Sequence, residues 1–173
     1  MLMKNEIVKK PVPPTDEENF VELQSFYVDM LTYIERLHRL LLDVIKVELD
    51  SKNVIEINSV QALLLYNIGN MELTAGELKS RGYYQGSNVS YNLKKLVDTD
   101  YVNYERSHID KRSVRVKLTP KGILIADMVK QMYHRHTTQI IDRRLIDIAG
   151  IEDICLVCKD FERFWTDNIR YGE

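Results

Sequence analysis

The stretch that decides the fold is TAGELKSRGYYQGSNVSYNLKKLVDTDYVNYERSHIDKRSVRVKLTPKG, which runs from Thr74 to Gly122. Its pattern predicts a short helix, a turn, a second helix, two alternating strands joined by a charged tip, and the start of a further helix. That order is a helix-turn-helix followed by a β-hairpin wing. We therefore expect a mainly α fold with a small β-wing, of the α+β class.

The second helix of this stretch has one apolar and one polar face. Ser87 can cap it, and apolar residues recur at Val89, Leu93 and Leu96 with the helical period. Hydroxyl and amide side chains on the other face can bond to base edges, and lysines can neutralise phosphates. The alternative is a helix face that is merely solvated. We expect DNA contacts from Ser87, Asn88, Ser90, Tyr91, Lys94 and Lys95.

The hairpin that follows carries a basic tip. Strand-like alternation covers residues 101–106 and 113–118, and the tip between them is His108 to Arg112. A basic tip next to a groove-binding helix can enter the minor groove, whose negative potential favours arginine. Asp110 can hold the guanidinium of Arg112 in place. An ordinary charged turn is the alternative to the DNA contacts that we expect from Arg106, Asp110, Lys111 and Arg112.

Charge is distributed unevenly along the chain. The 173 residues carry a net charge of −2, but residues 81–121 hold nine Lys and Arg against four Asp and Glu, a local net charge of +5. Such asymmetry indicates a surface that faces a polyanion on an otherwise acidic body.

Two helical seams flank the DNA-binding stretch. Apolar residues spaced alternately by three and four predict one long helix through Phe20 and Val44 and another from Ile151 to Trp165, beyond a break at Gly150. A chain this small can bury only part of both seams, which favours a dimer interface over intramolecular packing alone. We predict a disordered arm (1–15) and a single domain (16–173), with a helical dimerisation lobe (16–50 and 123–173) and a winged-helix lobe (55–122).

These features together resemble the MarR family of winged helix-turn-helix transcription regulators, over about residues 18–170. The wing sequence Glu105–Gly122, with Asp110-Lys111-Arg112 and the Leu118–Gly122 helix start, is similar to the family's signature, and Asn88–Leu96 is similar to its recognition helix. The resemblance implies a homodimer that binds double-stranded DNA at a pseudo-palindromic operator. It also implies repression relieved by a small aromatic or anionic effector bound between the two lobes, or by cysteine oxidation in some members.

Other chemistry has weaker support in the sequence. We expect no enzyme, cofactor or metal site, because no nucleophile elbow or phosphate loop appears and the Cys155/Cys158 pair lies inside an amphipathic helix. Cys158 falls on the apolar seam and is expected in the core. With no apolar run of membrane length and no signal peptide, we expect a cytoplasmic protein with no membrane partner. The alternatives are a winged-helix protein-interaction module without DNA binding and a redox-sensing regulator acting through these cysteines. Candidate residues for an effector pocket are His38, Tyr66, Met128 and Met132, with a surface or core-edge histidine and plain core residues as the alternative.

Overall fold

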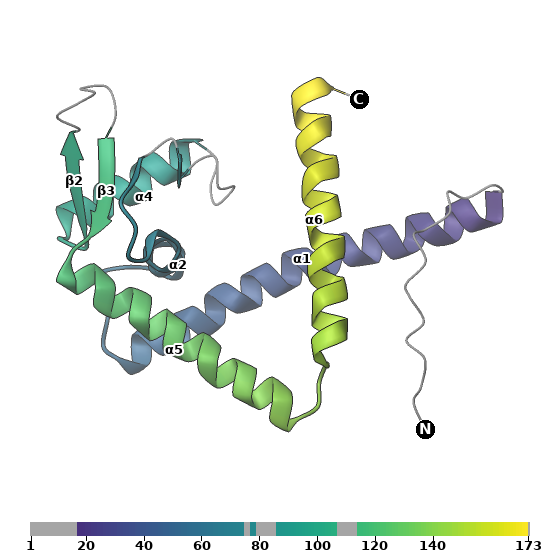
Figure 1. The fold of residues 1–173 in the computed structure, drawn as a ribbon, viewed down its shortest axis with the longest axis horizontal. Helices are drawn as coiled ribbons and strands as arrows, with labels where there is room; N and C mark the ends of the chain where they lie inside the picture. Colours follow the sequence, from purple (N-terminus) through teal and green to yellow (C-terminus); the bar gives the residue numbers. More distant parts are fainter. Residues whose placement is uncertain (1–16, 75–76, 79–85, 107–113, 173) are drawn as a thin grey trace.

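A computed structural model of the chain describes residues 17–74, 77–78, 86–106 and 114–172, with the backbone alone at 18, 86–89, 105, 106 and 114. The predicted arm at 1–15 lies outside this range. Figure 1 shows a small sheet and two helices gathered near one end of a long helix, which confirms the predicted fold class. The elements are α1 (Glu17–Ser51), α2 (Ser59–Ile68), β1 (Leu73–Thr74), α4 (Gly86–Asp98), β2 (Val102–Arg106), β3 (Val114–Leu118), α5 (Pro120–Asp142) and α6 (Ile148–Tyr171).

The sheet is antiparallel, with strand order β1–β3–β2. Val116 of β3 lies opposite both Leu73 and Tyr104, and Lys117 lies opposite Asn103. Because side chains alternate between the faces of a strand, Val116 is buried against the helices while Lys117 points to solvent. The alternation along the wing agrees with the sequence-based expectation, and β1 adds a third strand to it.

Side-chain caps start the helices where the sequence places polar residues. Asn58 Oδ1 accepts from the Gln61 amide over 2.9 Å, and Gln61 Oε1 accepts from the Asn58 amide, which completes a capping box before α2. Thr74 and Glu77 exchange the same pair of hydrogen bonds. Thr119 caps α5 by accepting from a backbone amide, with proline at the start of the helix as predicted.

A single hydrophobic core joins the winged helix to its flanks. Ile45 and Leu49 from α1, and Val129 and Met132 from α5, are buried together with residues of α2, α4 and the sheet. Burying one such side chain stabilises the fold by about 1.5–3 kcal/mol. The core therefore crosses the predicted lobe boundaries near residues 50 and 123, so the ends of α1 and α5 support the winged helix directly.

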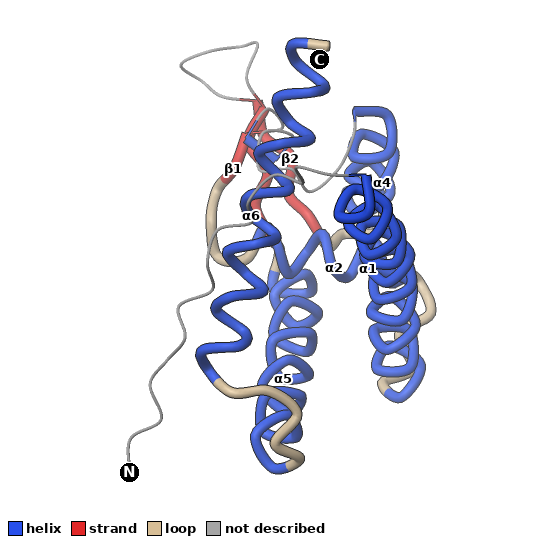
Figure 2. The backbone as a smooth tube through the Cα atoms, turned by 90° about the vertical axis from the view of Figure 1, so that its right-hand side faces the viewer, coloured by secondary structure: helices blue, strands red, loops and turns tan. Residues whose placement is uncertain are grey.

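The corner between α5 and α6 differs from the sequence-based expectation. Residues 143–147 separate the two helices, and Arg144 adopts a positive φ of 50° there. Gly150, expected to break the helix, instead lies in the first turn of α6, where its amide donates to Asp147 Oδ1 over 2.8 Å. The Asp147 cap starts the helix upstream of the glycine. Figure 2 shows α6 turning back from the far end of α5.

The outer half of α1 and all of α6 are poorly covered. No described residue of α6 is buried, and α6 meets α1 through Tyr27, whose ring stacks on Phe161 and whose hydroxyl accepts a hydrogen bond from Trp165 Nε1 over 3.2 Å. Between the two helices lies an apolar groove of about 1180 Å³. Its lining includes Phe26, Met30, Ile34, Leu37, Ile154, Val157, Cys158, Phe161, Trp165 and Ile169.

The cysteines are placed differently from the prediction. Cys155 and Cys158 are both exposed, and Cys158 lines the groove between α1 and α6. The expectation that Cys158 is a core residue is therefore wrong for the single chain, because α6 packs on α1 without entering the core. Among the described residues, no helix is both long and apolar enough to cross a lipid bilayer.

Candidate nucleic-acid interface

Helix α4 presents the polar face that the sequence predicts. Ser90, Tyr91, Lys94 and Lys95 are exposed, while the opposite face is packed into the core through Leu93, Leu96 and Val97. Among the described residues no acidic side chain forms an ion pair with Lys94 or Lys95. The backbone of Ser87 and Asn88 lies in the first turn of a helix that starts at Gly86, and their side chains lie outside the description.

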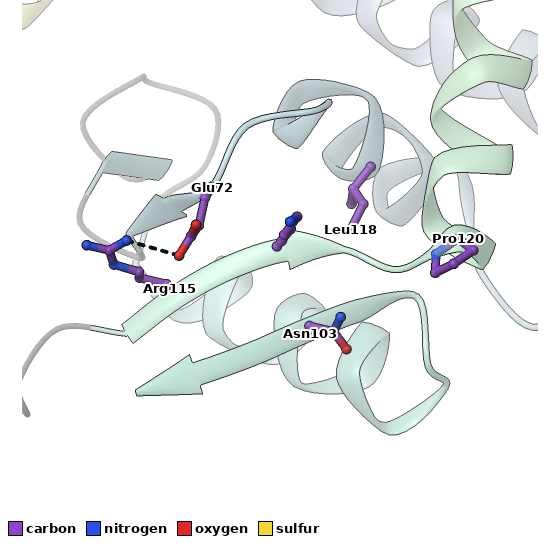
Figure 3. A pocket seen from close by; sticks show the side chains of 6 residues that line it. Glu72, Asn103, Arg115, Leu118 and Pro120 are labelled. Carbon is purple, nitrogen blue, oxygen red and sulfur yellow. Dashed lines mark hydrogen bonds and ion pairs between the residues drawn. The ribbon is translucent and has the colours of Figure 1, made fainter. Parts of the chain in front are cut away.

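The wing is described along its strands. Arg106 is the last residue of β2, with only its backbone described, and the expected contacts Asp110, Lys111 and Arg112 lie outside the described residues. On the outer face of the sheet, Arg115 Nη1 lies 3.1 Å from Glu72 Oε1 (Figure 3). Exposed pairs of this kind contribute about 0–1 kcal/mol. A cavity of about 380 Å³ on this face is lined by Glu72, Asn103, Arg115, Lys117, Leu118 and Pro120.

A buried amide pair ties α4 to α2. Gln61 Nε2 donates to Asn92 Oδ1 over 3.2 Å, and the two side chains are 1% and 9% exposed. The apolar contacts of α4 tolerate small rotations, whereas a buried hydrogen bond is directional, so this pair defines the orientation in which α4 presents its outer face. Sequence reasoning missed the pair. The signal available was the Asn58-x-x-Gln61 capping pattern, which identifies Gln61 as a structural amide.

We expect Gln61→Leu to destabilise the chain by about 1–3 kcal/mol, because it leaves the Asn92 amide buried with one partner fewer. The double variant Gln61→Leu/Asn92→Leu should lose less than the sum of the two single variants, since replacing both polar partners removes the desolvation penalty. Urea denaturation of all three variants provides the measurement. Strict additivity would show that the two amides stabilise the chain independently of one another.

A charged cluster joins the α1–α2 loop to the start of α5. Glu56 Oε2 accepts hydrogen bonds from Lys121 Nζ and, over 3.0 Å, from the Tyr101 hydroxyl, while Lys121 lies over the Tyr101 ring. The hydrogen bond from Lys121 lowers the pKa of Glu56, with help from Tyr101, and the same bond raises the pKa of Lys121. Burial and the Glu56 hydrogen bond raise the pKa of Tyr101. These contacts stabilise the turn between α4 and β2.

The lowered pKa of Glu56 gives a test by pH. Stabilisation by the Glu56 carboxylate is complete above its ordinary pKa of 4.5 and is lost as pH falls through the lowered folded-state pKa. Wild type should therefore exceed Glu56→Gln in free energy of unfolding at pH 7, and the difference should shrink below about pH 4.5. Urea denaturation of both proteins from pH 7 to pH 3 checks this. A difference that stays constant with pH would contradict an ionic role for Glu56.

The expected effector-pocket residues have different surroundings. Met128 and Met132 are core residues, and His38 is exposed on α1. Tyr66 packs against the core, edge-on to Tyr133, and burial together with Tyr66 raises the pKa of Tyr133. Tyr66 also lines a cavity of about 310 Å³ between α2 and α5, with Asn67, Gly69, Asn70, Met71, Ile123, Ala126, Asp127 and Lys130. Of these four predicted residues, only Tyr66 lines an open cavity in the part of the chain that the structure describes.

Comparisons with known proteins agree with this geometry. Residues 57–122 match a family described as a winged helix DNA-binding domain. A curated relative is the exopolysaccharide II synthesis transcriptional activator ExpG of Rhizobium meliloti (strain 1021), which is 34% identical over 179 residues that cover 99% of this chain and 89% of the relative.

Solved structures share the fold. FabT of Streptococcus pneumoniae in complex with DNA superposes with a TM-score of 0.65 at 22% identity, over 82% of this chain and 98% of FabT. MarR of Staphylococcus aureus in complex with salicylate and kanamycin gives a TM-score of 0.65 at 20% identity, over 84% of this chain and 96% of that protein.

Proposed function

The chain belongs to the MarR family of winged helix-turn-helix transcription regulators, and from this premise we propose that it is a cytoplasmic homodimer that binds a pseudo-palindromic operator and responds to a small effector. The observation that carries the proposal is the outer face of α4. Its exposed Ser90, Tyr91, Lys94 and Lys95 have hydrogen-bonding groups or positive charge, and the lysines lack acidic partners among the described residues. Such a face suits a major groove lined by phosphates.

The groove between α1 and α6 supports the dimer. Large apolar side chains dominate its lining, and most of them are exposed to water in the single chain. Exposed apolar patches of this extent mark interaction sites. To bind a pseudo-palindromic operator, a two-fold axis through this region must place the two copies of α4 about one helical turn of DNA apart, roughly 34 Å. Two half-sites also supply the specificity that one helix and one wing lack.

The cavity beside Tyr66 supports an effector site. The aromatic ring can pack against an aromatic ligand, and Lys130 can pair with its carboxylate, which together suit the aromatic or anionic effector expected from the family resemblance. Because this cavity lies between α2 and α5, a bound ligand would bear on the helices that position α4. His38, Met128 and Met132, proposed from the sequence, have no place in its lining.

The sense of regulation is proposed from the relative. The family resemblance alone implied repression, whereas the relative that covers nearly the whole chain is named a transcriptional activator. We therefore propose activation for this chain, with repression as the alternative. A reporter fused to the bound promoter distinguishes them, because deletion of the regulator lowers the signal in the first case and raises it in the second.

Selection of bound fragments from a random DNA pool tests the function. We expect an enriched pseudo-palindrome whose binding weakens steeply between about 50 and 200 mM salt, because neutralised phosphates release counterions. Lys94→Met/Lys95→Met should weaken binding on every sequence, and Arg112→Ala should cost on the order of 1–3 kcal/mol if it makes a specific groove contact. No enrichment at any salt concentration would instead favour a protein-interaction module.

The same selection separates the effector from the redox alternative. Cys155 is exposed and lies outside the lining of the groove proposed as the dimer interface, so peroxide can reach it, whereas Cys158 lines that groove. A regulator that senses oxidation should lose operator binding on peroxide treatment and keep it in the Cys155→Ser/Cys158→Ser variant. A regulator that senses an aromatic acid should respond to the acid in both proteins.

A further inference from the structure

A cavity of about 310 Å³ opens between the candidate recognition helix and the wing. Helix α4 contributes Ser90, Leu93, Lys94 and Val97 to its lining, and β2 contributes Tyr104. Helix α4 packs against β2, so the two walls of the cavity are neighbouring elements of the winged helix. The cavity thus joins the polar face of α4 to the strand that leads to the wing tip.

Tyr104 occupies an unusual position on its strand. It lies opposite Val116 on the face of the sheet that also carries Val102, and both valines are buried. Tyr104 is nevertheless 51% exposed, because it extends beyond the edge of the core toward the outer side of α4. Within the part of the chain that the structure describes, its hydroxyl has no hydrogen-bond partner.

Lys94 provides a positive charge on the other wall. Its side chain is exposed, and among the described residues no carboxylate lies within ion-pair distance of its ammonium group. On the outer face of the same sheet, by contrast, Arg115 is paired with Glu72. The cavity therefore combines a cation and a neutral hydroxyl donor above an apolar floor formed by Leu93 and Val97.

We propose that this cavity seats one phosphate of the DNA backbone in each half-site, with Lys94 Nζ and the Tyr104 hydroxyl as donors. The proposal rests on DNA binding by α4 and adds Tyr104, which no sequence pattern identified, to the interface. If α4 occupies the major groove and the wing tip approaches the adjacent minor groove, the strand that separates the two grooves must pass over the surface between α4 and β2. Leu93 and Val97 then face the sugar beside the phosphate.

The two donors differ in charge, and the difference defines the test. Lys94→Met removes a counterion-releasing contact, so the slope of log affinity against log salt should become shallower by about one per half-site. Tyr104→Phe removes only a hydroxyl, so affinity for the selected operator should fall about tenfold per half-site at one salt concentration with the slope unchanged. Each substitution should reduce affinity by the same factor on specific as on non-specific DNA. Lys117→Met, an exposed lysine on the opposite face of the sheet, is the matched control.

Ethylation interference on the operator locates the contact. One phosphate per half-site whose ethylation weakens wild-type binding should matter less in Lys94→Met and cease to matter in Lys94→Met/Tyr104→Phe, and circular dichroism should show unchanged folding for every variant. The proposal is overturned if Tyr104→Phe binds within twofold of wild type, or if Lys94→Met changes the slope no more than Lys117→Met. Wild type that binds no DNA would overturn the proposed function as well, whereas normal wild-type binding with unaffected variants would overturn this inference alone.

Discussion

Replacement of Gly122 by alanine is expected to destabilise the chain by about 4 kcal/mol or more, the range of the most damaging single substitutions. An added Cβ would lie 2.1 Å from the carbonyl oxygen of Tyr101. That oxygen cannot move freely, because it accepts a hydrogen bond from the Thr119 amide over 3.1 Å. Alanine is favoured over glycine inside a helix by only about 1 kcal/mol, so the clash outweighs the gain in helix propensity. Urea denaturation followed by circular dichroism provides the measurement.

Gly172→Ala is the matched control for this substitution. Gly172 has a positive φ of 69°, but no atom lies within 4 Å of an added Cβ. The free energy of unfolding of Gly172→Ala should fall only by the roughly 1–2 kcal/mol that a left-handed conformation costs an L-residue. A similar loss of stability in the two variants would show that the Tyr101 carbonyl moves to make room for the added Cβ at residue 122. A much larger loss for Gly122→Ala would confirm that the start of α5 is held against the turn between α4 and β2.

Val157→Glu is expected to convert the proposed dimer into monomers and to reduce operator affinity by at least about 100-fold. Val157 lines the groove between α1 and α6 and is 47% exposed in the single chain, so a glutamate there leaves the core intact. In a dimer, the same carboxylate would be buried without a partner, which is costly. Losing the link between two half-sites removes the gain of about 100- to 10,000-fold that bivalent binding provides. Sedimentation analysis and fluorescence anisotropy with labelled operator measure the two effects.

Leu156→Glu separates the groove from the rest of α6. Leu156 is 52% exposed and is not among the residues that line the groove. Because adjacent helical residues are about 100° apart, it projects away from the face that carries Val157. We expect Leu156→Glu to dimerise and bind DNA like wild type. Monomerisation by Leu156→Glu, or a dimer that survives Val157→Glu, would place the interface elsewhere on the chain.

Much of the winged helix could be predicted because its signals are local. Thr74 and Glu77 cap a helix across three residues, Thr119 and Pro120 begin α5, and alternation marks both strands of the wing. The polar face of α4 was predicted for the same reason, since helical periodicity alone separates Lys94 from Leu93. Where two local signals competed, as at Gly150, the sequence could not rank them, and the Asp147 cap prevailed.

The parts of the site that were missed involve residues far apart in the chain. Gln61 bonds to a partner 31 residues away, and Lys121 to one 65 residues away. The sequence marks Tyr104 only as an aromatic residue of a strand, and its place beside α4 follows from the tertiary structure. The sequence could not distinguish the candidate effector residues from plain core residues for the same reason, because burial in a shared core, which separates Met132 from Tyr66, depends on how the helices pack.

The sequence by itself determined the order of the elements, the apolar face that each helix carries and the surplus of positive charge in the wing region, because periodicity, capping and composition act within a few residues. Only the tertiary structure decided that α1 and α5 complete the core of the winged helix, that Tyr101 leaves no room for a side chain at Gly122, and that the seams of α1 and α6 remain uncovered. These features depend on close packing between distant segments. The sequence shows that two helices each carry an apolar face, but only their positions in the folded chain show whether that chain can bury both faces.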